Sequence, residues 1–122
     1  MLKKLNEFTP EEFESQKHPF SIKRLSTTIG AELHDIDLTK DLSKEEIGHI
    51  YNALLTYKVI FFRDQNITTE EHLRFGQYFG ELEIHPFAPL GTNREDHPEV
   101  LRITHDEENK PKENAWHSDV TW

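Results

Sequence analysis

The residues best suited to chemistry lie in the last segment of the chain, Trp116-His117-Ser118-Asp119-Val120-Thr121-Trp122. Side chains two positions apart in an extended strand project from the same face, so His117 and Asp119 place an imidazole beside a carboxylate. These groups are two of the three ligands in the 2-His-1-carboxylate triad, which holds non-haem Fe(II) and leaves positions open for reaction. We expect the third ligand to come from residues beyond this sequence, so His117 and Asp119 are candidate metal ligands of an incomplete site.

A His-x-Asp pair is a weak signal by itself. With 8 histidines and 23 acidic residues among 122, chance alone supplies such a pair, and the alternative is a surface histidine beside a carboxylate. The flanking Trp116 and Trp122, and a polar loop at 106–115 that leads into the segment, favour a metal site on a strand. We expect surface or structural roles for most of the other histidines apart from His85, namely His18, His34, His49, His72, His97 and His105.

The elements that position this segment can be predicted from local patterns. Capping boxes, in which a Ser or Thr is followed three residues later by Glu, predict three helices, beginning after Thr9, Ser43 and Thr68. Apolar runs predict strands, the third of them buried, at 20–26, 31–36, 59–62 and 100–104. This order of helices and strands indicates a mixed α+β fold. Helical spacing predicts the apolar faces of the second and third helices, formed by Ile47, Ile50, Tyr51, Leu54 and Leu55, and by Phe75, Tyr78, Phe79 and Leu82.

Composition bounds the class of protein and its partners. Of the 122 residues, 34% are hydrophobic and 30% are charged, which is lean for an independent core, so we expect residues 1–122 to form a single partial domain. The formal net charge of −9 argues against nucleic acid and against an anionic membrane as partners. The absence of cysteine excludes thiolate ligands and disulfides. The sequence contains neither the apolar run of a signal peptide nor a membrane-spanning stretch, which predicts a cytoplasmic protein.

Four segments, in this order along the chain, resemble the taurine dioxygenase family of Fe(II)- and 2-oxoglutarate-dependent dioxygenases. They are Ile29-Gly30-Ala31-Glu32-Leu33 with Asp37-Leu38, Val59-Ile60-Phe61-Phe62-Arg63-Asp64-Gln65, Phe79-Gly80-Glu81-Leu82 with His85-Pro86, and the last seven residues. The resemblance implies the N-terminal part of a double-stranded β-helix (jelly-roll) dioxygenase with flanking helices. It also implies Fe(II) as the cofactor, 2-oxoglutarate as the co-substrate, O2 as a reactant and a homo-oligomer.

The resemblance assigns roles to individual residues. His117 and Asp119 match two of the three iron ligands, whereas the third ligand and the arginine that pairs with 2-oxoglutarate have no counterpart in this sequence. His85 matches the histidine that binds the sulfonate of taurine; the alternative is that it only marks a turn. Val120 is expected to line the substrate pocket, and Asn114 to contact the substrate if the loop before it is shifted by one residue.

One departure from the family pattern bears on the substrate. The taurine enzyme has a tyrosine three residues after the sulfonate-binding histidine, whereas this chain has Ala88. The change removes a polar contact and enlarges the pocket. We therefore expect a small anionic substrate bulkier than taurine, an alkyl sulfonate or a sulfate ester, hydroxylated with release of sulfite or sulfate. Two alternatives stay open: the same fold acting on a small carboxylate such as an aryloxyalkanoate, or a non-catalytic fragment or binding module.

Overall fold

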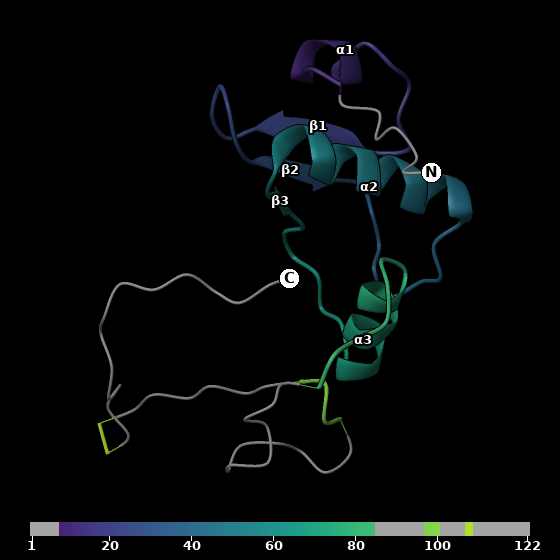
Figure 1. Cartoon of the computed structure of the whole chain (residues 1–122), viewed down its shortest axis with the longest axis vertical. Helices are drawn as coiled ribbons and strands as arrows, with labels where there is room; N and C mark the ends of the chain where they lie inside the picture. Colours follow the sequence, from purple (N-terminus) through teal and green to yellow (C-terminus); the bar gives the residue numbers. More distant parts are fainter. Residues whose placement is uncertain (1–7, 85–96, 101–106, 109–122) are drawn as a thin grey trace. The chain divides into compact units, whose positions relative to one another are not determined.

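A computed structural model of the chain describes residues 8–84, 97–100 and 107–108. The chain divides into two compact units, Met1–Leu82 and Glu83–Trp122, and every described helix and strand belongs to the first. In chain order these elements are α1 (Pro10–Glu14), β1 (Ser21–Arg24), β2 (Ala31–His34), α2 (Lys44–Tyr57), β3 (Ile60–Phe61) and α3 (Thr69–Gln77) (Figure 1). The predicted mixed α+β class is confirmed. Apart from Val100, the strands predicted at 100–104 and in the last segment lie outside the described residues.

All three helices begin where the capping boxes predict. In each box the hydroxyl of the N-cap accepts a hydrogen bond from the backbone N–H three residues later, and the glutamate there accepts one from the N–H of the cap. The first N–H groups of a helix have no partner within it, so the boxes satisfy them locally. The pairs are Thr9 with Glu12, Ser43 with Glu46, and Thr68 with Glu71. None of the described helices combines the length and the apolar character needed to cross a membrane.

The three strands form one sheet in the order β1-β2-β3. One face of this sheet packs against α2 (Figure 1). β1 runs antiparallel to β2, whereas β2 and β3 are parallel, with Ala31 opposite Ile60. Parallel neighbours need a long connection, and here α2 supplies it. The buried core combines residues of α1, the sheet and α2, and its members are Phe13, Phe20, Ala31, Leu33, Ile50, Ala53 and Tyr57.

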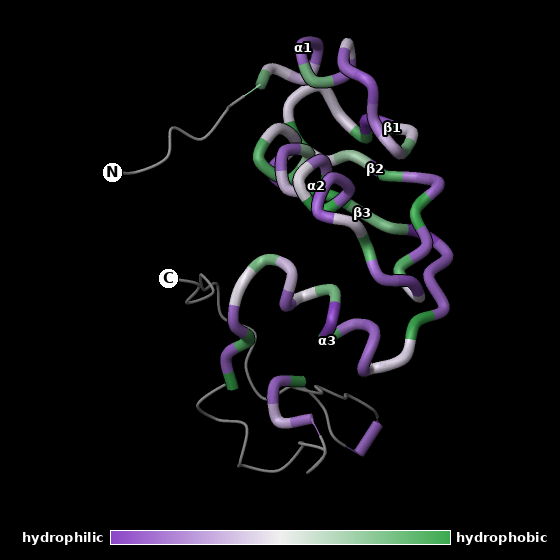
Figure 2. Tube along the Cα trace, turned by 90° about the vertical axis from the view of Figure 1, so that its right-hand side faces the viewer, coloured by the Kyte–Doolittle hydropathy of each residue, from purple (hydrophilic) through white to green (hydrophobic). Residues whose placement is uncertain are grey.

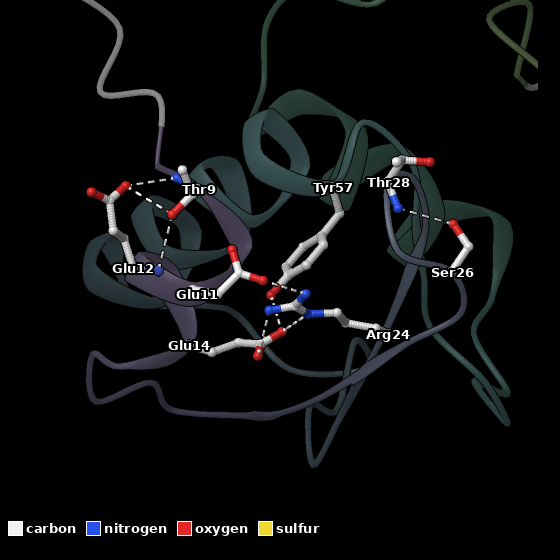
Figure 3. A network of polar contacts seen from close by, with 8 residues as sticks. All are labelled: Thr9, Glu11, Glu12, Glu14, Arg24, Ser26, Thr28 and Tyr57. Carbon is white, nitrogen blue, oxygen red and sulfur yellow. Dashed lines mark hydrogen bonds and ion pairs between the residues drawn. The ribbon is translucent and has the colours of Figure 1, made fainter.

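A charged network around Arg24 ties α1 to β1 and to the end of α2 (Figure 3). The guanidinium donates to Glu14 through Nε and Nη2 and to Glu11 through Nη1, at 2.8 Å for Glu11. The hydroxyl of Tyr57 donates to the same Glu14 carboxylate at 2.8 Å. The hydrogen bonds from Arg24 hold the pKa of Glu14 below its ordinary value, and burial raises the pKa of Tyr57. The short helix α1 is thus fixed by side chains from two other elements.

The apolar faces differ from the sequence prediction in two places. In α2 the buried positions are Ile50, Ala53, Thr56 and Tyr57, whereas Tyr51 is 40% exposed. Figure 2 shows hydrophobic and hydrophilic residues mixed along this helix. The strand predicted within 59–62 is confirmed at Ile60–Phe61, but the prediction that it is buried is wrong, because Phe61 is 38% exposed while Ile60 packs against the core. Successive strand side chains face opposite sides, and α2 covers only one side. A continuous apolar run does not reveal which side is covered.

Candidate functional site

The five residues predicted to bind metal or substrate lie outside the described residues: His85, Asn114, His117, Asp119 and Val120. Their roles therefore remain predictions. Within the described part of the chain, no three His, Cys, Asp or Glu side chains gather closely enough to hold a metal ion. What the structure describes is the framework before His85, which consists of the carboxyl ends of β2 and β3, the segment 36–42, and α3.

The chain turns sharply after both parallel strands. Asp35, directly after β2, has a φ of 67°, and Asp64, three residues after β3, has a φ of 56°. Such left-handed conformations cost energy for most residues, and Asp and Asn tolerate them best after glycine because their short side chains can hydrogen-bond locally. The carboxylate of Asp35 accepts a hydrogen bond from the hydroxyl of Ser21 on the neighbouring strand. The exits from the two strands are therefore defined turns.

Gln65 joins these two exits. Its Nε2 donates to the carbonyl oxygens of Ile36 at 2.9 Å and of Arg63 at 3.2 Å, and its Oε1 accepts from the N–H of Leu38 at 3.0 Å. Leu38 is only 5% exposed, so the N–H that Gln65 satisfies is one that water cannot easily reach. One amide side chain thus supplies hydrogen bonds to backbone groups in the segments that follow both β2 and β3.

The carboxylate of Glu32 on β2 pairs with basic residues on the sheet face that carries Phe61. Its side chain accepts from Arg63 Nε at 3.0 Å and from His34 Nε2 at 3.1 Å, and it lies 3.5 Å from Lys23 Nζ. The bond from Arg63, with the nearby positive charges, keeps the pKa of Glu32 below its ordinary value. Arg63 also lies 5.2 Å above the ring of Phe61, in cation–π range. Glu32 is only 8% exposed, yet its carboxylate has three basic partners, which indicates a structural role for this carboxylate.

Helix α3 is held to the segment 36–42 by polar side chains. Arg74 Nη2 donates to the carbonyl oxygens of Leu38 at 3.1 Å and of Thr39 at 2.8 Å. The hydroxyl of Tyr78 accepts from the N–H of Leu42 at 3.2 Å. No residue of α3 is buried, although Phe75 packs against the core from its edge. Hydrogen bonds to backbone groups of a loop therefore hold this helix, together with partly buried aromatic contacts such as that of Phe75 with Phe62.

The chain folds back on α3 just before it reaches His85. α3 ends at Gln77, earlier than the aromatic spacing predicts, with Tyr78 as its C-cap. A Cβ placed on Gly76 would lie 2.9 Å from Cδ2 of Leu82, so the absence of a side chain at Gly76 makes room for Leu82. Because Leu82 is three residues before His85, this contact is the last described tie before the predicted substrate-binding histidine.

The sequence patterns did not predict the long-range contacts of Glu32, Gln65 and Arg74. Glu32 and Gln65 stand inside two segments that carry the family resemblance, which was the available signal for them. Strand alternation could also have placed Glu32 and Lys23 on one face, since they are paired in the register of β1 and β2. The hydrogen bonds of Gln65 and Arg74 to backbone atoms of the segment 36–42 span 27 to 36 positions, and spacing along the chain does not reveal such contacts.

Comparisons with known proteins agree on one family. The family model "Taurine catabolism dioxygenase TauD, TfdA family" matches residues 21–122. An alkylsulfatase of Acinetobacter baylyi is 32% identical over 102 residues, and an alpha-ketoglutarate-dependent sulfate ester dioxygenase of Pseudomonas putida is 32% identical over 116. An (S)-phenoxypropionate/alpha-ketoglutarate-dioxygenase of Sphingobium herbicidovorans is 31% identical over 107. These alignments cover 83%, 93% and 84% of this chain but 31%, 35% and 36% of the relatives, so the chain spans about a third of their length.

A solved structure shares its fold with part of this chain. It belongs to a candidate alpha-ketoglutarate-dependent taurine dioxygenase from Burkholderia xenovorans. The superposition has a TM-score of 0.59 at 40% sequence identity, and it covers 65% of this chain and 28% of that one. The helices and the small mixed sheet described above therefore match part of the fold of that structure.

Proposed function

Since the chain belongs to the taurine catabolism dioxygenase TauD, TfdA family, we propose that it is the N-terminal part of an Fe(II)- and 2-oxoglutarate-dependent dioxygenase. The observation that carries this proposal is the family match over residues 21–122, which includes His117 and Asp119. The relatives that the chain matches are named as oxygenases dependent on alpha-ketoglutarate or as a sulfatase. Residues 1–122 are proposed to be one incomplete domain of that enzyme.

In the proposed site, each candidate residue has a role that its chemistry suits. His117 and Asp119 hold the iron, since an imidazole and a carboxylate are two members of the donor set typical of non-haem Fe(II). When bound, the iron lets O2 oxidise 2-oxoglutarate and transfer one oxygen atom to a substrate C–H bond. His85 donates a hydrogen bond to the anionic group of the substrate and orients it. Asn114 adds a second polar contact, and Val120 contributes an apolar wall.

The overall reaction converts substrate, 2-oxoglutarate and O2 into hydroxylated substrate, succinate and CO2. We propose an alkyl sulfate ester or alkyl sulfonate as the substrate, supported by the two relatives named for sulfate esters. Hydroxylation at the carbon that bears the sulfate gives an unstable product. Its hydroxyl oxygen forms a C=O bond as the C–O bond to sulfate breaks, which releases an aldehyde, sulfate and the hydroxyl proton. A sulfonate reacts in the same way, except that the C–S bond breaks and sulfite leaves.

A small carboxylate is the second candidate substrate. The relative named for (S)-phenoxypropionate is 31% identical to this chain, nearly as similar as the two sulfate ester relatives. A carboxylate can accept the same hydrogen bond from His85 as a sulfate oxygen, so that residue alone does not separate the two classes. Hydroxylation next to the ether oxygen of such a substrate would release a phenol.

The experiment that tests the proposal uses a protein of the full length of the relatives, of which residues 1–122 correspond to about a third. Succinate formation is measured with alkyl sulfates, alkyl sulfonates and aryloxyalkanoates, together with release of sulfate, sulfite or phenol. We expect the sulfate esters or sulfonates to give the highest rates. If none of the three classes stimulates succinate formation, the substrate assignment is contradicted. A highest rate with aryloxyalkanoates would favour the second candidate.

The metal assignment is tested separately. Anaerobic addition of Fe(II) and 2-oxoglutarate is expected to produce a visible charge-transfer band in the intact enzyme. The band should disappear in His117→Ala and persist in His72→Ala, which changes an exposed histidine of α3. A band that survives in His117→Ala would remove that residue from the set of iron ligands.

A further inference from the structure

Two histidines outside the proposed iron site share a direct hydrogen bond. His18 precedes β1 and His49 belongs to α2, and their Nδ1 atoms lie 3.0 Å apart. The other ring nitrogen of His18, Nε2, lies 2.6 Å from the carbonyl oxygen of Phe13. A carbonyl oxygen only accepts, so Nε2 of His18 carries a hydrogen, and in a neutral pair Nδ1–H of His49 donates to the lone pair on Nδ1 of His18. This bond fastens the segment between α1 and β1 to α2.

Aromatic side chains hold the ring of His18 in this orientation. The ring stacks on Phe20 at a centroid distance of 5.4 Å, and it lies 4.1 Å from the ring of Phe13. Phe13 and Phe20 are themselves buried members of the core. Rotation of His18 would break both ring contacts and the bond to the carbonyl oxygen of Phe13. His18 therefore keeps Nδ1 directed at His49, and only His49, which is half-buried on α2, can turn away.

The charged groups around the pair are engaged elsewhere or exposed. Within residues 8–84, no ion pair includes either imidazole. The charged side chains on the surrounding elements are Glu11, Glu12 and Glu14 in α1, Lys17 before β1, Lys23 and Arg24 in β1, and Lys44, Glu45 and Glu46 in α2. Those of α1 and β1, together with Glu46, bond to other partners, and the remaining three are exposed. The charge of the pair is therefore set by the protons that its own rings bind.

We propose that the pair is an acid-sensitive latch, which stays closed with no added proton or with one and opens when both rings are protonated. One added proton makes His49 an imidazolium that still donates from Nδ1, and a charged donor strengthens the bond. A second proton must occupy Nδ1 of His18. Two N–H groups would then face each other across 3.0 Å without an acceptor, and both rings would be positive. His49 must then turn away, which releases the segment 15–20 from α2.

The latch predicts a definite sign for the dependence of stability on pH. An ordinary histidine titrates near pH 6.5, so two independent histidines in the unfolded chain bind about two protons at pH 5. The closed pair binds only one. Because the unfolded state binds more protons, stability falls as the pH falls below about 6.5. While the latch stays closed, the unfolding equilibrium constant rises by up to about tenfold per pH unit, which corresponds to one excess proton.

The shared hydrogen is tested by nuclear magnetic resonance of the chain with isotope-labelled histidine. At pH 7 we expect a scalar coupling between the two Nδ1 nuclei across the N–H···N bond, because that coupling requires a hydrogen held between them. On acidification the coupling should disappear while the chain is still folded, and amide hydrogen exchange should accelerate in the segment 15–20 before it does in the core of α2. Absence of the coupling at pH 7 would overturn the proposal, as would a coupling that persists until the chain unfolds.

His49→Asn separates a titrating latch from a merely structural contact. The asparagine amide can donate or accept near the position of Nδ1, so it provides a partner for His18 in either protonation state. We expect His49→Asn to lose the rise in the unfolding constant between pH 6.5 and 5, as measured by urea unfolding at each pH. His72→Asn, at an exposed position of α3, should keep the slope of the parent. A parental slope in His49→Asn, or an equal loss of slope in both variants, would contradict the latch. Neither measurement depends on whether the proposed enzyme is active.

Discussion

The two parts of the first unit are held together by different physics. α1, α2 and the sheet share an apolar core in which Phe13, Ile50 and Ala53 are at most 1% exposed. α3 has no buried residue; Arg74 and Tyr78 bind backbone groups of the segment 36–42, and the partly buried Phe75 adds an apolar contact with the core. Elements with few buried contacts open locally more easily than the core does. The chain therefore has a firm platform and a less firmly held helix, and the helix is the element that leads to His85.

The core side of this comparison is tested by matched isoleucines. Ile50→Ala removes a side chain that is 0% exposed, and we expect a loss of about 2–5 kcal/mol in the free energy of unfolding. Ile29→Ala makes the same change at a position that is 51% exposed, and it should change stability by no more than about 0.5 kcal/mol. Urea unfolding of both variants measures the difference. Similar losses at both positions would mean that the apolar core does not dominate the stability of this region.

The polar side is tested at Gln65. Gln65→Ala leaves the buried N–H of Leu38 without its partner, which costs about 1–3 kcal/mol. We expect this cost to appear locally, as faster amide hydrogen exchange in α3 and in the segment 36–42, with little change in α2. Gln77→Ala is the matched control, because Gln77 is exposed in α3 itself. Equal acceleration in α2 and α3 would show that the two regions open together, and the contrast between them would be lost.

The sequence predicted those features of both regions that depend on neighbours along the chain. The three capping boxes need only residues three apart, and they place the helix starts correctly. Ile50 is buried as the helical spacing predicts. The exposure of Tyr51 and of Phe61 depends on which element covers which side, and the apolar pattern alone gave the wrong answer for these two residues. The bonds from Gln65 and Arg74 to Leu38 depend on the three-dimensional path of the chain. The iron and substrate residues were predicted from a motif, and they lie outside the described residues.

The pH dependence of stability tests the charged network that fixes α1. Arg24 lowers the pKa of Glu14 in the folded state below its ordinary value of 4.5. A depressed pKa means that the carboxylate stabilises the folded state above the unfolded pKa, and that this contribution is lost as pH falls through the folded pKa. We expect Glu14→Gln to be less stable than the parent at pH 7 and to approach it at pH 3, as measured by the midpoint of urea unfolding. Glu81→Gln, at an exposed position after α3, should keep the pH dependence of the parent; an identical profile in Glu14→Gln would deny the network a role in stability.

The smallest predicted effect has opposite signs at two helical glycines. A Cβ added at Gly48 in α2 would meet no atom within 4 Å, so Gly48→Ala should stabilise the protein by about 0.5–1 kcal/mol through helix propensity alone. Gly76→Ala gives α3 the same gain in propensity, but its Cβ would lie 2.9 Å from Leu82 Cδ2 and must displace that side chain. We expect the gain to be cancelled or reversed.

Leu82→Ala is the variant that separates propensity from the contact between Gly76 and Leu82. In that background the obstacle is gone, and Gly76→Ala should regain the stabilisation seen at Gly48. The coupling between positions 76 and 82, obtained from urea unfolding of the four proteins in the cycle, measures how firmly the chain after α3 is tied to the helix. If Gly76→Ala stabilises equally with and without the leucine, Leu82 moves aside freely. Leu82, three residues before His85, would then not be held against α3. In that case α3 could not help to position the predicted substrate-binding histidine.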